Sequence, residues 1–400
     1  MNERVFVSGN EAVALGVRLA RPQVISAYPI TPQTVAVERL SEMVEDGSLK
    51  TEYLHVESEH SAISAAIGAS AVGARTFTAT SSQGLLYMAE GLFYASGGRF
   101  PIVMMNANRA LALPWNIYGD QQDSLALLNS GWIQIYVEDA QEALDMMIQA
   151  YAVAEDPRVL TPVMVNLDGF VLTHTYEPVL VPAQEDVDAF LPPYQTTNRM
   201  SFEAPTNMGF TAPPAFYTEF KIQQHRAILG SAEVIREVDQ RFGEAFGRSY
   251  GGLVEAYRAE DADFLLVTLG SVTGTARLVV DRLREAGRRV GLVKLRTMRP
   301  FPREELATLC TKALAVGVLE KNISLGHEGN VFTHVKSAVP GNVLGFVAGL
   351  GGRDVSKDDI REAFNHLETA VQSPAVPASS NVIFLNPGVT LDEPEYTPVP

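Results

Sequence analysis

Short apolar runs rich in β-branched residues alternate with segments of helical periodicity along the N-terminal part of this chain. Runs of this length, separated by helices, are typical of strands in a parallel sheet that helices cover on both faces. Helix candidates fill every gap between the runs except the one after residue 105. The strand candidates are residues 24–27, 53–56, 76–79, 102–105, 133–136 and 162–166.

A second block of the same kind begins at Asp263, so the chain is expected to form two α/β domains. Its strand candidates are residues 264–268, 290–295, 315–319 and 343–347, with a turn at 270–274 and a helix at 275–286. The expected organisation is a domain at 1–180, a connector arm and bridging helix at 181–260, a domain at 261–370 and an extended tail at 371–400. The bridging helix is predicted at about 232–260. The tail carries an acidic patch at 392–395 and no core-forming pattern, which suits a segment lying across a partner chain.

The composition excludes several classes of function. A formal net charge of −16 disfavours nucleic-acid binding, which needs clustered Lys and Arg. Cys310 is the single cysteine, so the chain can form neither an internal disulfide nor a four-thiolate iron-sulfur site, and we expect a small buried residue there. No apolar run is long enough to span a bilayer, and residues 1–9 lack a secretory signal, so no membrane association and a cytoplasmic location are expected.

Three polar sites fall where predicted strands end or helices begin. They are residues 28–32 (Tyr-Pro-Ile-Thr-Pro), residues 57–60 (Glu-Ser-Glu-His) and Asn108-Arg109, which leads on to residues 119–123 (Gly-Asp-Gln-Gln-Asp). Ligands of open α/β sheets bind at the carboxyl ends of the strands. We therefore expect a hydroxyl, a carboxylate and a guanidinium to converge there.

Glu59 opens a helix whose next residues are small or apolar nearly all round, so its carboxylate is expected to be poorly solvated. In one interpretation Ser58 caps this helix and Glu59 only compensates the helix dipole. In the other, the carboxyl group binds a ligand nitrogen. A metal site from His55, Glu57, Glu59 and His60 is disfavoured because the spacing fits no zinc pattern.

Thr31 and Arg109 each allow two interpretations. Thr31 lies in a turn stiffened by Pro29 and Pro32, and we expect it to be the N-cap of a helix beginning at Pro32, with a hydroxyl that can also face a cleft. Arg109 suits bidentate capture of a carboxylate, or it forms a structural ion pair with Asp120 or Asp123.

Taken together, these motifs resemble the alpha subunit of the pyruvate:ferredoxin oxidoreductase family, the CoA-acylating 2-oxoacid:acceptor oxidoreductases that use thiamine diphosphate. The resemblance is strong over residues 5–175 and includes residues 80–85 (Thr-Ser-Ser-Gln-Gly-Leu). It continues more loosely through residues 269–274, 299–302 and 349–354. It implies a doubly wound, pyrimidine-type thiamine diphosphate-binding domain followed by a transketolase C-terminal-like α/β domain.

The resemblance also implies roles for single residues. Glu59 matches the glutamate that hydrogen-bonds the aminopyrimidine ring of thiamine diphosphate and activates the coenzyme, and Pro29 is expected to contact the same coenzyme. Thr31 and Arg109 match the positions that hold the carboxylate of the substrate. No protein ligand for a metal ion is expected in this chain.

The resemblance implies a multi-subunit enzyme that decarboxylates a 2-oxoacid oxidatively and transfers the acyl group to coenzyme A. The chain lacks a Gly-Asp-Gly segment for Mg²⁺ and diphosphate, so a beta subunit is expected to complete the site. Iron-sulfur (4Fe–4S) clusters belong on other chains, among them gamma and ferredoxin-like delta subunits, in a dimer of heteromultimers. Pyruvate is the first substrate candidate. An aryl or branched 2-oxoacid, such as phenylglyoxylate or 2-oxoisovalerate, is the alternative, with NAD as final acceptor through a flavoprotein. A noncatalytic scaffold subunit is a further alternative.

Two glycine-containing turns remain outside this assignment. The turn at 270–274 could hold an anion at a helix start, but no Lys follows it, so a tight turn in a structural domain is preferred. Residues 327–329 (His-Glu-Gly) are predicted to form a turn near a subunit interface.

Overall fold

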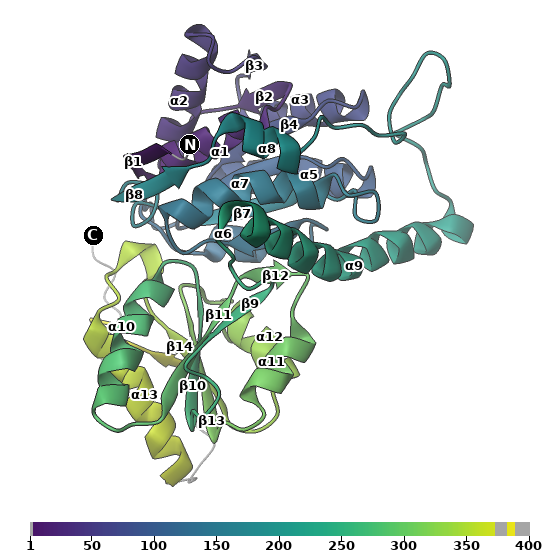
Figure 1. Cartoon of the computed structure of the whole chain (residues 1–400). Helices are drawn as coiled ribbons and strands as arrows, with labels where there is room; N and C mark the ends of the chain where they lie inside the picture. The colour runs from purple at the N-terminus through teal and green to yellow at the C-terminus, as the bar shows by residue number, and fades with distance from the viewer. Residues whose placement is uncertain (1–2, 373–381, 389–400) are drawn as a thin grey trace.

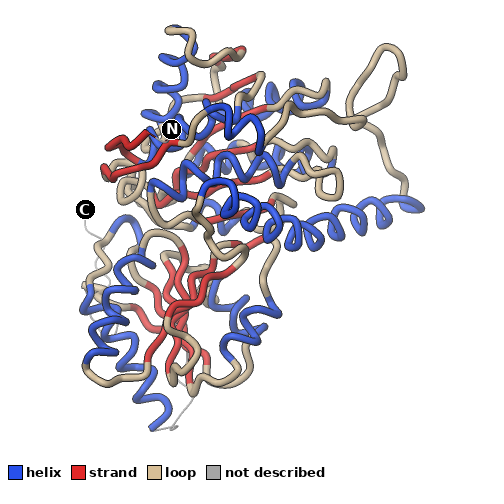
Figure 2. The backbone as a smooth tube through the Cα atoms, in the orientation of Figure 1, coloured by secondary structure: helices blue, strands red, loops and turns tan. Residues whose placement is uncertain are grey.

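The computed structural model describes residues 3–372 and 382–388 and contains two α/β domains, one beside the other (Figure 1). Each domain has a central sheet with helices on both sides (Figure 2), which confirms the predicted α/β class. The acidic patch at 392–395 and most of the predicted tail lie outside the described residues. The tail residues that are described include a strand, β15 (Val382–Phe384), which pairs with the second sheet.

The first domain has a central sheet with helices on both faces, and the strands in the middle of this sheet are buried. Its strands are β1 (Glu3–Ser8), β2 (Val24–Ala27), β3 (Glu52–His55), β4 (Thr76–Thr80), β5 (Val103–Asn108), β6 (Ile133–Tyr136), β7 (Val163–Asp168) and β8 (Tyr176–Val181). Its helices are α1 (Gly9–Ala20), α2 (Thr34–Glu45), α3 (Glu59–Ala71), α4 (Ser82–Tyr87), α5 (Ala89–Gly97), α6 (Gln122–Ala126) and α7 (Ala140–Ala154). Strands β1 and β8 form a separate antiparallel pair.

The site is positioned by the order of the main sheet, β12-β6-β7-β5-β4-β2-β3. The pairs β3–β2, β2–β4, β4–β5 and β5–β7 are all parallel. Parallel strands end at the same edge of a sheet, so the carboxyl ends of five neighbouring strands meet there. These ends are Ala27, His55, Thr80, Asn108 and Asp168.

The second domain holds a six-stranded sheet in the order β15-β14-β13-β10-β11-β9, in which only β9 is antiparallel to its neighbour. Its strands are β9 (Val254–Tyr257), β10 (Phe264–Leu269), β11 (Val290–Leu295), β13 (Ala315–Glu320) and β14 (Val343–Val347), with β15 at the edge. Its helices are α10 (Val272–Glu285), α11 (Arg303–Cys310), α12 (Asn330–Ala338), α13 (Lys357–Gln372) and the short η1 (Leu350–Gly352).

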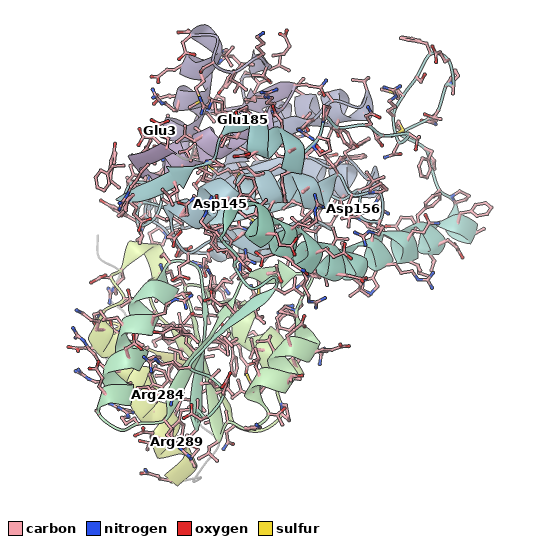
Figure 3. The ribbon with its side chains drawn as sticks, in the orientation of Figure 1. Glu3, Asp145, Asp156, Glu185, Arg284 and Arg289 are labelled. Atoms are coloured by element: carbon pink, nitrogen blue, oxygen red, sulfur yellow. The ribbon has the colours of Figure 1, made fainter. Side chains whose placement is uncertain are left out.

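Arg284 and Arg289 lie at the end of this domain away from the first (Figure 3). They pair with Asp261 at 2.8 Å and Asp263 at 2.5 Å.

The two domains are joined by more than the connecting chain. Strand β12 (Thr297–Arg299), which follows the second domain's β11, pairs antiparallel with β6 at the edge of the first sheet. Next to it Glu142, on α7 of the first domain, accepts hydrogen bonds from Lys294 Nζ at 2.7 Å and Arg296 Nε at 2.9 Å. All three side chains are buried, so a shared strand and an ion cluster fix the domains to each other.

The connector differs from its prediction in the bounds of its helix. Helices α8 (Gln184–Phe190) and α9 (Pro214–Phe246) are separated by a long connection, part of which extends away from the domains (Figure 1). Its earlier part contacts the first domain, where the Met200 N–H donates to the Ala71 carbonyl at 2.7 Å. The bridging helix predicted at about 232–260 is therefore wrong at both ends. Helix α9 has Pro214 in its first turn, a position that suits proline. It ends at Gly247, whose φ of +70° lies outside the helical region.

Most predicted elements of both domains are confirmed to within three residues, and strands 24–27, 133–136, 290–295 and 343–347 match in full. The gap after residue 105 does contain a helix, α6, which was not expected. Cys310 is buried as predicted, and burial raises the pKa of its thiol to about 12. Among the described helices, none is both long enough and apolar enough to span a lipid bilayer.

Candidate functional site

The turn that follows β2 is anchored by buried amides. The Asn10 side chain donates to the Pro32 carbonyl at 2.9 Å, and the Gln33 side chain donates to the Tyr28 carbonyl at 2.8 Å. Gln33 also lies 3.5 Å from the carbonyl of Ala79, so the turn sits against the carboxyl end of β4. These bonds hold the backbone of the turn and leave its outer side chains exposed.

Thr31 is not the helix cap that the sequence predicts. Residues 30–33 first close a turn of their own, in which the Gln33 N–H donates to the Ile30 carbonyl at 2.9 Å. Helix α2 then begins at Thr34, and Gln33 occupies the N-cap position without a side-chain bond. Thr31 and Pro29 are consequently exposed at the carboxyl edge of the sheet, where their side chains can face a ligand.

Glu59 occupies the first position of helix α3. The Ser58 hydroxyl accepts a hydrogen bond from the Ser61 N–H at 3.2 Å, which confirms the predicted cap. Glu59 itself is only 8% exposed. In residues 3–372 and 382–388 no hydrogen bond or ion pair reaches its carboxylate. A mostly buried carboxylate without a protein partner is available to accept a hydrogen bond from a ligand.

The surroundings of Glu59 are shaped closely to its carboxylate. A methyl group placed on Gly84 of α4 would lie 2.6 Å from Glu59 Oε1 and 2.6 Å from Thr80 Oγ1. The Thr80 hydroxyl is buried and has no hydrogen-bond partner in the described part of the chain. An unpaired carboxylate and an unpaired hydroxyl therefore adjoin at the end of β4, and both could bind a polar ligand.

The side chains around Glu59 do not gather into a metal site. The neighbouring Glu57 is exposed and accepts a hydrogen bond from the Ser61 hydroxyl, whereas His60 faces Glu90 at 3.7 Å. Nowhere in the described ranges do three or more His, Cys, Asp or Glu side chains come together as a metal would need.

Arg109 follows β5 directly and is 4% exposed. Its Nη1 donates to the Thr31 carbonyl at 2.9 Å, and its Nε donates to the Asn116 carbonyl at 3.2 Å. The Trp115 ring lies 5.2 Å from the guanidinium, a cation–π distance. Within the described residues no carboxylate pairs with this guanidinium, so the alternative of an ion pair with Asp120 or Asp123 is wrong. Burial lowers the pKa of Arg109, and the charge of the nearby Asp123 carboxylate opposes this shift.

Asp123 has a structural role instead. Its carboxylate accepts backbone N–H bonds from Ser82 at 3.0 Å, Arg109 at 3.1 Å and Ser124 at 2.7 Å, and an amide bond from Asn108 at 2.7 Å. Burial raises its pKa to about 6, although these donors oppose the shift. Asp123 thus ties the end of β5 to the start of α4.

Asp168, which the sequence motifs did not indicate, binds the glycine turn at 270–274 of the second domain. It accepts from the Ser271 N–H at 2.9 Å, Lys321 Nζ at 3.1 Å and Gln121 Nε2 at 2.9 Å. Burial raises its pKa, but the Lys321 charge and these bonds outweigh burial and lower it. The turn at Gly270 does hold an anion, and that anion is the protein's own carboxylate, so the preferred structural interpretation is confirmed.

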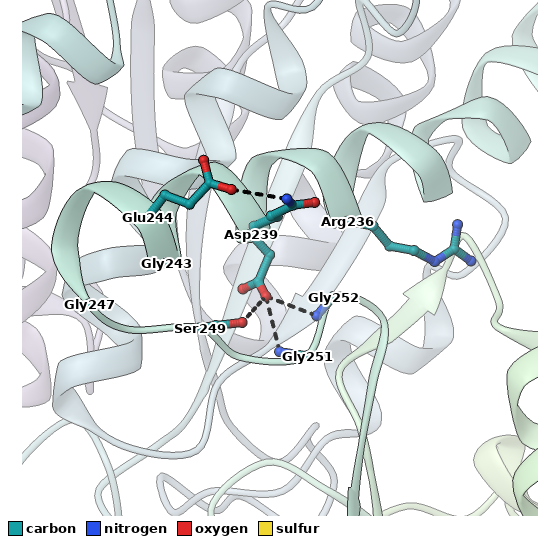
Figure 4. A pocket seen from close by; sticks show the side chains of 9 residues that line it. Arg236, Asp239, Gly243, Glu244, Gly247, Ser249, Gly251 and Gly252 are labelled. Atoms are coloured by element: carbon teal, nitrogen blue, oxygen red, sulfur yellow. Dashed lines mark hydrogen bonds between the residues drawn. The ribbon is translucent and has the colours of Figure 1, made fainter.

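One hollow elsewhere in the structure is lined by polar groups that already bond to one another. A depression of about 530 Å³ beside the end of α9 has Asp239 at its floor (Figure 4). The Asp239 carboxylate accepts from the Ser249 hydroxyl at 2.6 Å and from the N–H groups of Tyr250, Gly251 and Gly252. The Asp239 carboxylate therefore anchors the loop that follows α9. Of residues 327–329 only His327 is exposed, whereas Gly329 is buried; Leu325 beside them is 87% exposed.

Comparison with known proteins identifies the family. Residues 15–240 match the family model "Pyruvate flavodoxin/ferredoxin oxidoreductase, thiamine diP-bdg", and residues 262–360 match "Pyruvate:ferredoxin oxidoreductase core domain II". This chain is an alpha subunit of the 2-oxoacid:ferredoxin oxidoreductase family. The resemblance inferred from the sequence motifs is confirmed.

Curated relatives of this alpha subunit align over most of their length. Pyruvate synthase subunit PorA of Methanothermobacter thermautotrophicus is 50% identical over 368 residues, which cover 92% of this chain and 96% of the relative. The same subunit of Methanocaldococcus jannaschii is 51% identical over 374 residues, covering 92% and 96%. Ketoisovalerate oxidoreductase subunit VorA of Pyrococcus abyssi is 44% identical over 373 residues, covering 92% and 94%.

Solved structures support the fold. The 2-oxoglutarate:ferredoxin oxidoreductase of Magnetococcus marinus matches with a TM-score of 0.74 at 21% identity, covering 92% of this chain and 65% of that one. A split-gene transketolase matches with a TM-score of 0.51 at 13% identity, covering 91% and 98%. These likenesses agree with a thiamine diphosphate-binding domain followed by a transketolase C-terminal-like domain.

Proposed function

We propose that this alpha subunit supplies one half of an active site for CoA-dependent oxidative decarboxylation of a 2-oxoacid, with pyruvate as the first candidate. The observation that carries the proposal is the buried Glu59 carboxylate, which lacks a partner among the described residues and adjoins the unpaired Thr80 hydroxyl. A side chain in this state fits a ligand that brings a hydrogen-bonding nitrogen.

Thiamine diphosphate fits this donor set. Its aminopyrimidine ring offers ring and exocyclic nitrogens, to which the Glu59 carboxyl and the Thr80 hydroxyl could bind, and Pro29 in the exposed turn would bound the same pocket. When bound, the coenzyme supplies the electron sink that the decarboxylation of a 2-oxoacid needs. Glu59 would hold the ring and exchange a proton with its nitrogen, and the absence of a side chain on Gly84 leaves the carboxylate the space that it occupies.

Thr31 and Arg109 would bind the carboxylate of the substrate. The guanidinium has no anionic partner in the described residues, and its bond to the Thr31 carbonyl places both residues side by side. Buried arginine binds carboxylates strongly because its planar donors match both oxygens. The contact has to be temporary, since this carboxylate leaves as carbon dioxide.

The charge at this position favours a substrate with one carboxylate. Among the described residues, no cationic side chain other than Arg109 hydrogen-bonds to the turn at 28–33. A dianion such as oxalate is therefore disfavoured. Pyruvate comes first because relatives at 50% and 51% identity are pyruvate synthase subunits. A branched 2-oxoacid is the second candidate, because ketoisovalerate oxidoreductase subunits are 44% identical.

The partner subunits follow from what this chain lacks in sequence. A beta subunit would bring Mg²⁺ and the groups that hold the diphosphate, since no Gly-Asp-Gly segment occurs here. Gamma and ferredoxin-like delta subunits would carry the 4Fe–4S clusters, because the single Cys310 cannot ligate one. Ferredoxin, or NAD through a flavoprotein, would take the electrons, and coenzyme A would take the acyl group. The cytoplasmic location, the dimer of heteromultimers and the domain boundaries stay predictions.

The test compares two glutamates two residues apart in the purified intact complex. Glu59→Gln should abolish CoA-dependent reduction of a viologen dye by pyruvate, whereas Glu57→Gln, at an exposed position, should leave it unchanged. Both variants should assemble normally on size-exclusion chromatography. Full turnover in Glu59→Gln would remove this residue from the mechanism and favour a scaffold subunit. A panel of 2-oxoacids in the same assay ranks pyruvate against the branched and aryl candidates by kcat/KM.

A further inference from the structure

The loop between Arg109 and α6 is held by the second domain. Asn116 forms a bridge: its backbone carbonyl accepts from Arg109 Nε at 3.2 Å, and its side-chain Nδ2 donates to the Gly351 carbonyl at 2.9 Å. Its Oδ1 accepts from the Tyr118 N–H at 2.6 Å, which locks the side chain in this orientation. A continuous chain of hydrogen bonds thus leads from Gly351 through Asn116 to Arg109 and on to Thr31.

Two further bonds from the second domain hold the same loop. Asp120 is 1% exposed and accepts from the Gly351 N–H at 3.0 Å, so Gly351 is bound through both of its backbone polar groups. The Gln121 N–H donates to the Lys321 carbonyl at 2.9 Å. Burial raises the pKa of Asp120, and the bond from the Gly351 N–H opposes that shift.

The residues of the second domain at this contact are glycines for a steric reason. A methyl group on Gly351 would lie 2.5 Å from Asn116 Nδ2, and one on Gly352 would collide with Tyr118 Cβ. Both glycines also have positive φ angles, of 59° and 82°. The backbone at Gly351 and Gly352 therefore lies so close to the loop that a larger side chain at either position would clash with it.

The loop has little other support. Leu113 is 87% exposed, Trp115 69% and Tyr118 53%, so these side chains do not pack into a core of their own. Residues 112–118 are mostly exposed, so they keep a fixed conformation only where bonds offset their entropy. Within the loop the Ala110 N–H donates to the Tyr118 carbonyl at 3.0 Å, and the Tyr118 ring contacts Phe170. The bonds that hold Asn116 between these points come from Arg109 on one side and from Gly351 on the other.

We propose that residues 349–352 of the second domain position the Arg109 guanidinium through Asn116, and so set the affinity of the site for the 2-oxoacid carboxylate. The inference rests on the proposed role of Arg109. It gives the second domain a function at the active site, and Asn116 acts as a positioning residue that does not touch the substrate itself.

Asn116→Ala isolates this effect. It removes the side-chain bonds to the Gly351 carbonyl and the Tyr118 N–H, and it keeps the backbone carbonyl that Arg109 uses. The domains stay joined, because β12 and the Glu142 cluster lie elsewhere in the interface. In the intact complex KM for pyruvate should rise about tenfold, the usual effect of losing one hydrogen bond, with kcat within about twofold.

The decisive experiment is a double-mutant cycle with Arg109→Ala. If Asn116 acts through Arg109, the double variant should have the same KM as Arg109→Ala alone. Additive increases in KM would overturn the inference, and so would an unchanged KM in Asn116→Ala when Arg109→Ala raises it. If Arg109→Ala itself leaves KM unchanged, the proposed substrate site fails instead.

A control and a second readout separate positioning from general loosening. Arg277→Gln breaks another interdomain ion pair, to Glu138 at 2.9 Å, without touching the loop, and should leave KM unchanged. Hydrogen–deuterium exchange of peptides covering residues 110–119 should speed up in Asn116→Ala and stay unchanged in Arg277→Gln. Equal exchange in both variants and the wild type would contradict a tether.

Discussion

Gly84 offers a sharp test of how closely the fold is built around Glu59. In Gly84→Ala the new methyl group would lie 2.6 Å from Glu59 Oε1, 2.6 Å from Thr80 Oγ1 and 2.9 Å from Glu59 Cγ. Ordinary contacts between carbon and oxygen are no closer than about 3.3 Å. The carboxylate therefore has to retreat by about 0.7 Å, or helix α4 has to move by the same amount.

The two consequences differ in size. Alanine is favoured over glycine in a helix by about 1 kcal/mol, whereas overpacking costs about 1 to 3 kcal/mol, so the free energy of unfolding should fall by only about 0 to 2 kcal/mol. Catalysis is more sensitive, because a misplacement of about 1 Å can cost a factor of about 100. We expect kcat/KM for pyruvate to fall roughly 50- to 100-fold, which corresponds to about 2.5 kcal/mol.

The assay is CoA-dependent viologen reduction by the intact complex, with stability followed by thermal unfolding. Gly68→Ala is the matched control, since Gly68 also lies in a helix, α3, but a methyl group there would meet nothing within 4 Å. It should keep full activity and gain up to about 1 kcal/mol. Full activity in Gly84→Ala would refute the reasoning, because the carboxylate would then tolerate displacement. Equal losses in both variants would do so too.

Three further predictions concern stability and reactivity. Burial raises the pKa of Glu320 from 4.5 to about 7, so the stability it contributes is fully present below pH 4.5 and is lost as pH rises through about 7. Between pH 4.5 and 8 the free energy of unfolding of the wild type should fall by about 3 kcal/mol relative to that of Glu320→Gln, as measured by urea unfolding. A difference between the two proteins that does not change with pH would contradict this. Glu142→Gln removes the carboxylate shared by buried Lys294 and Arg296, and should lower the free energy of unfolding by about 3 kcal/mol; a loss below about 1 kcal/mol would show that water or other carboxylates replace it. Cys310, buried with a pKa of about 12, should react with thiol reagents only after unfolding, and labelling of the native complex would count against its burial.

The sequence predicted those features that depend on local pattern. Apolar runs of four to six residues mark strands such as 133–136 because a strand covered by helices on both sides must be apolar throughout. The Ser58 cap was predicted because a serine hydroxyl just before a helix can accept a backbone N–H of the first turn. The proximity of Thr31 and Arg109 followed from the rule that parallel strands end at one edge, and the bond between them confirms it.

Features that depend on distant contacts were not predictable in the same way. Strand β12 has only three residues, and it is a strand because it pairs with β6 of the other domain. Asp168 carries no local signal beyond its place at a strand end, and its partner Ser271 lies 103 residues away. The error at Thr31 has a partly similar origin, because the distant Asn10 amide binds the Pro32 carbonyl and the Gln33 N–H closes a separate turn before α2 begins.

The most direct test of the central claim measures what Glu59 does to the coenzyme before any substrate binds. In the intact complex with thiamine diphosphate bound, exchange of the thiazolium C2 proton for deuterium can be followed by NMR after rapid quenching. Glu59→Gln should slow this exchange by about 100-fold or more, the usual contribution of a general acid–base group, while Glu57→Gln exchanges at the wild-type rate. Wild-type exchange in Glu59→Gln with the coenzyme fully bound would contradict the account.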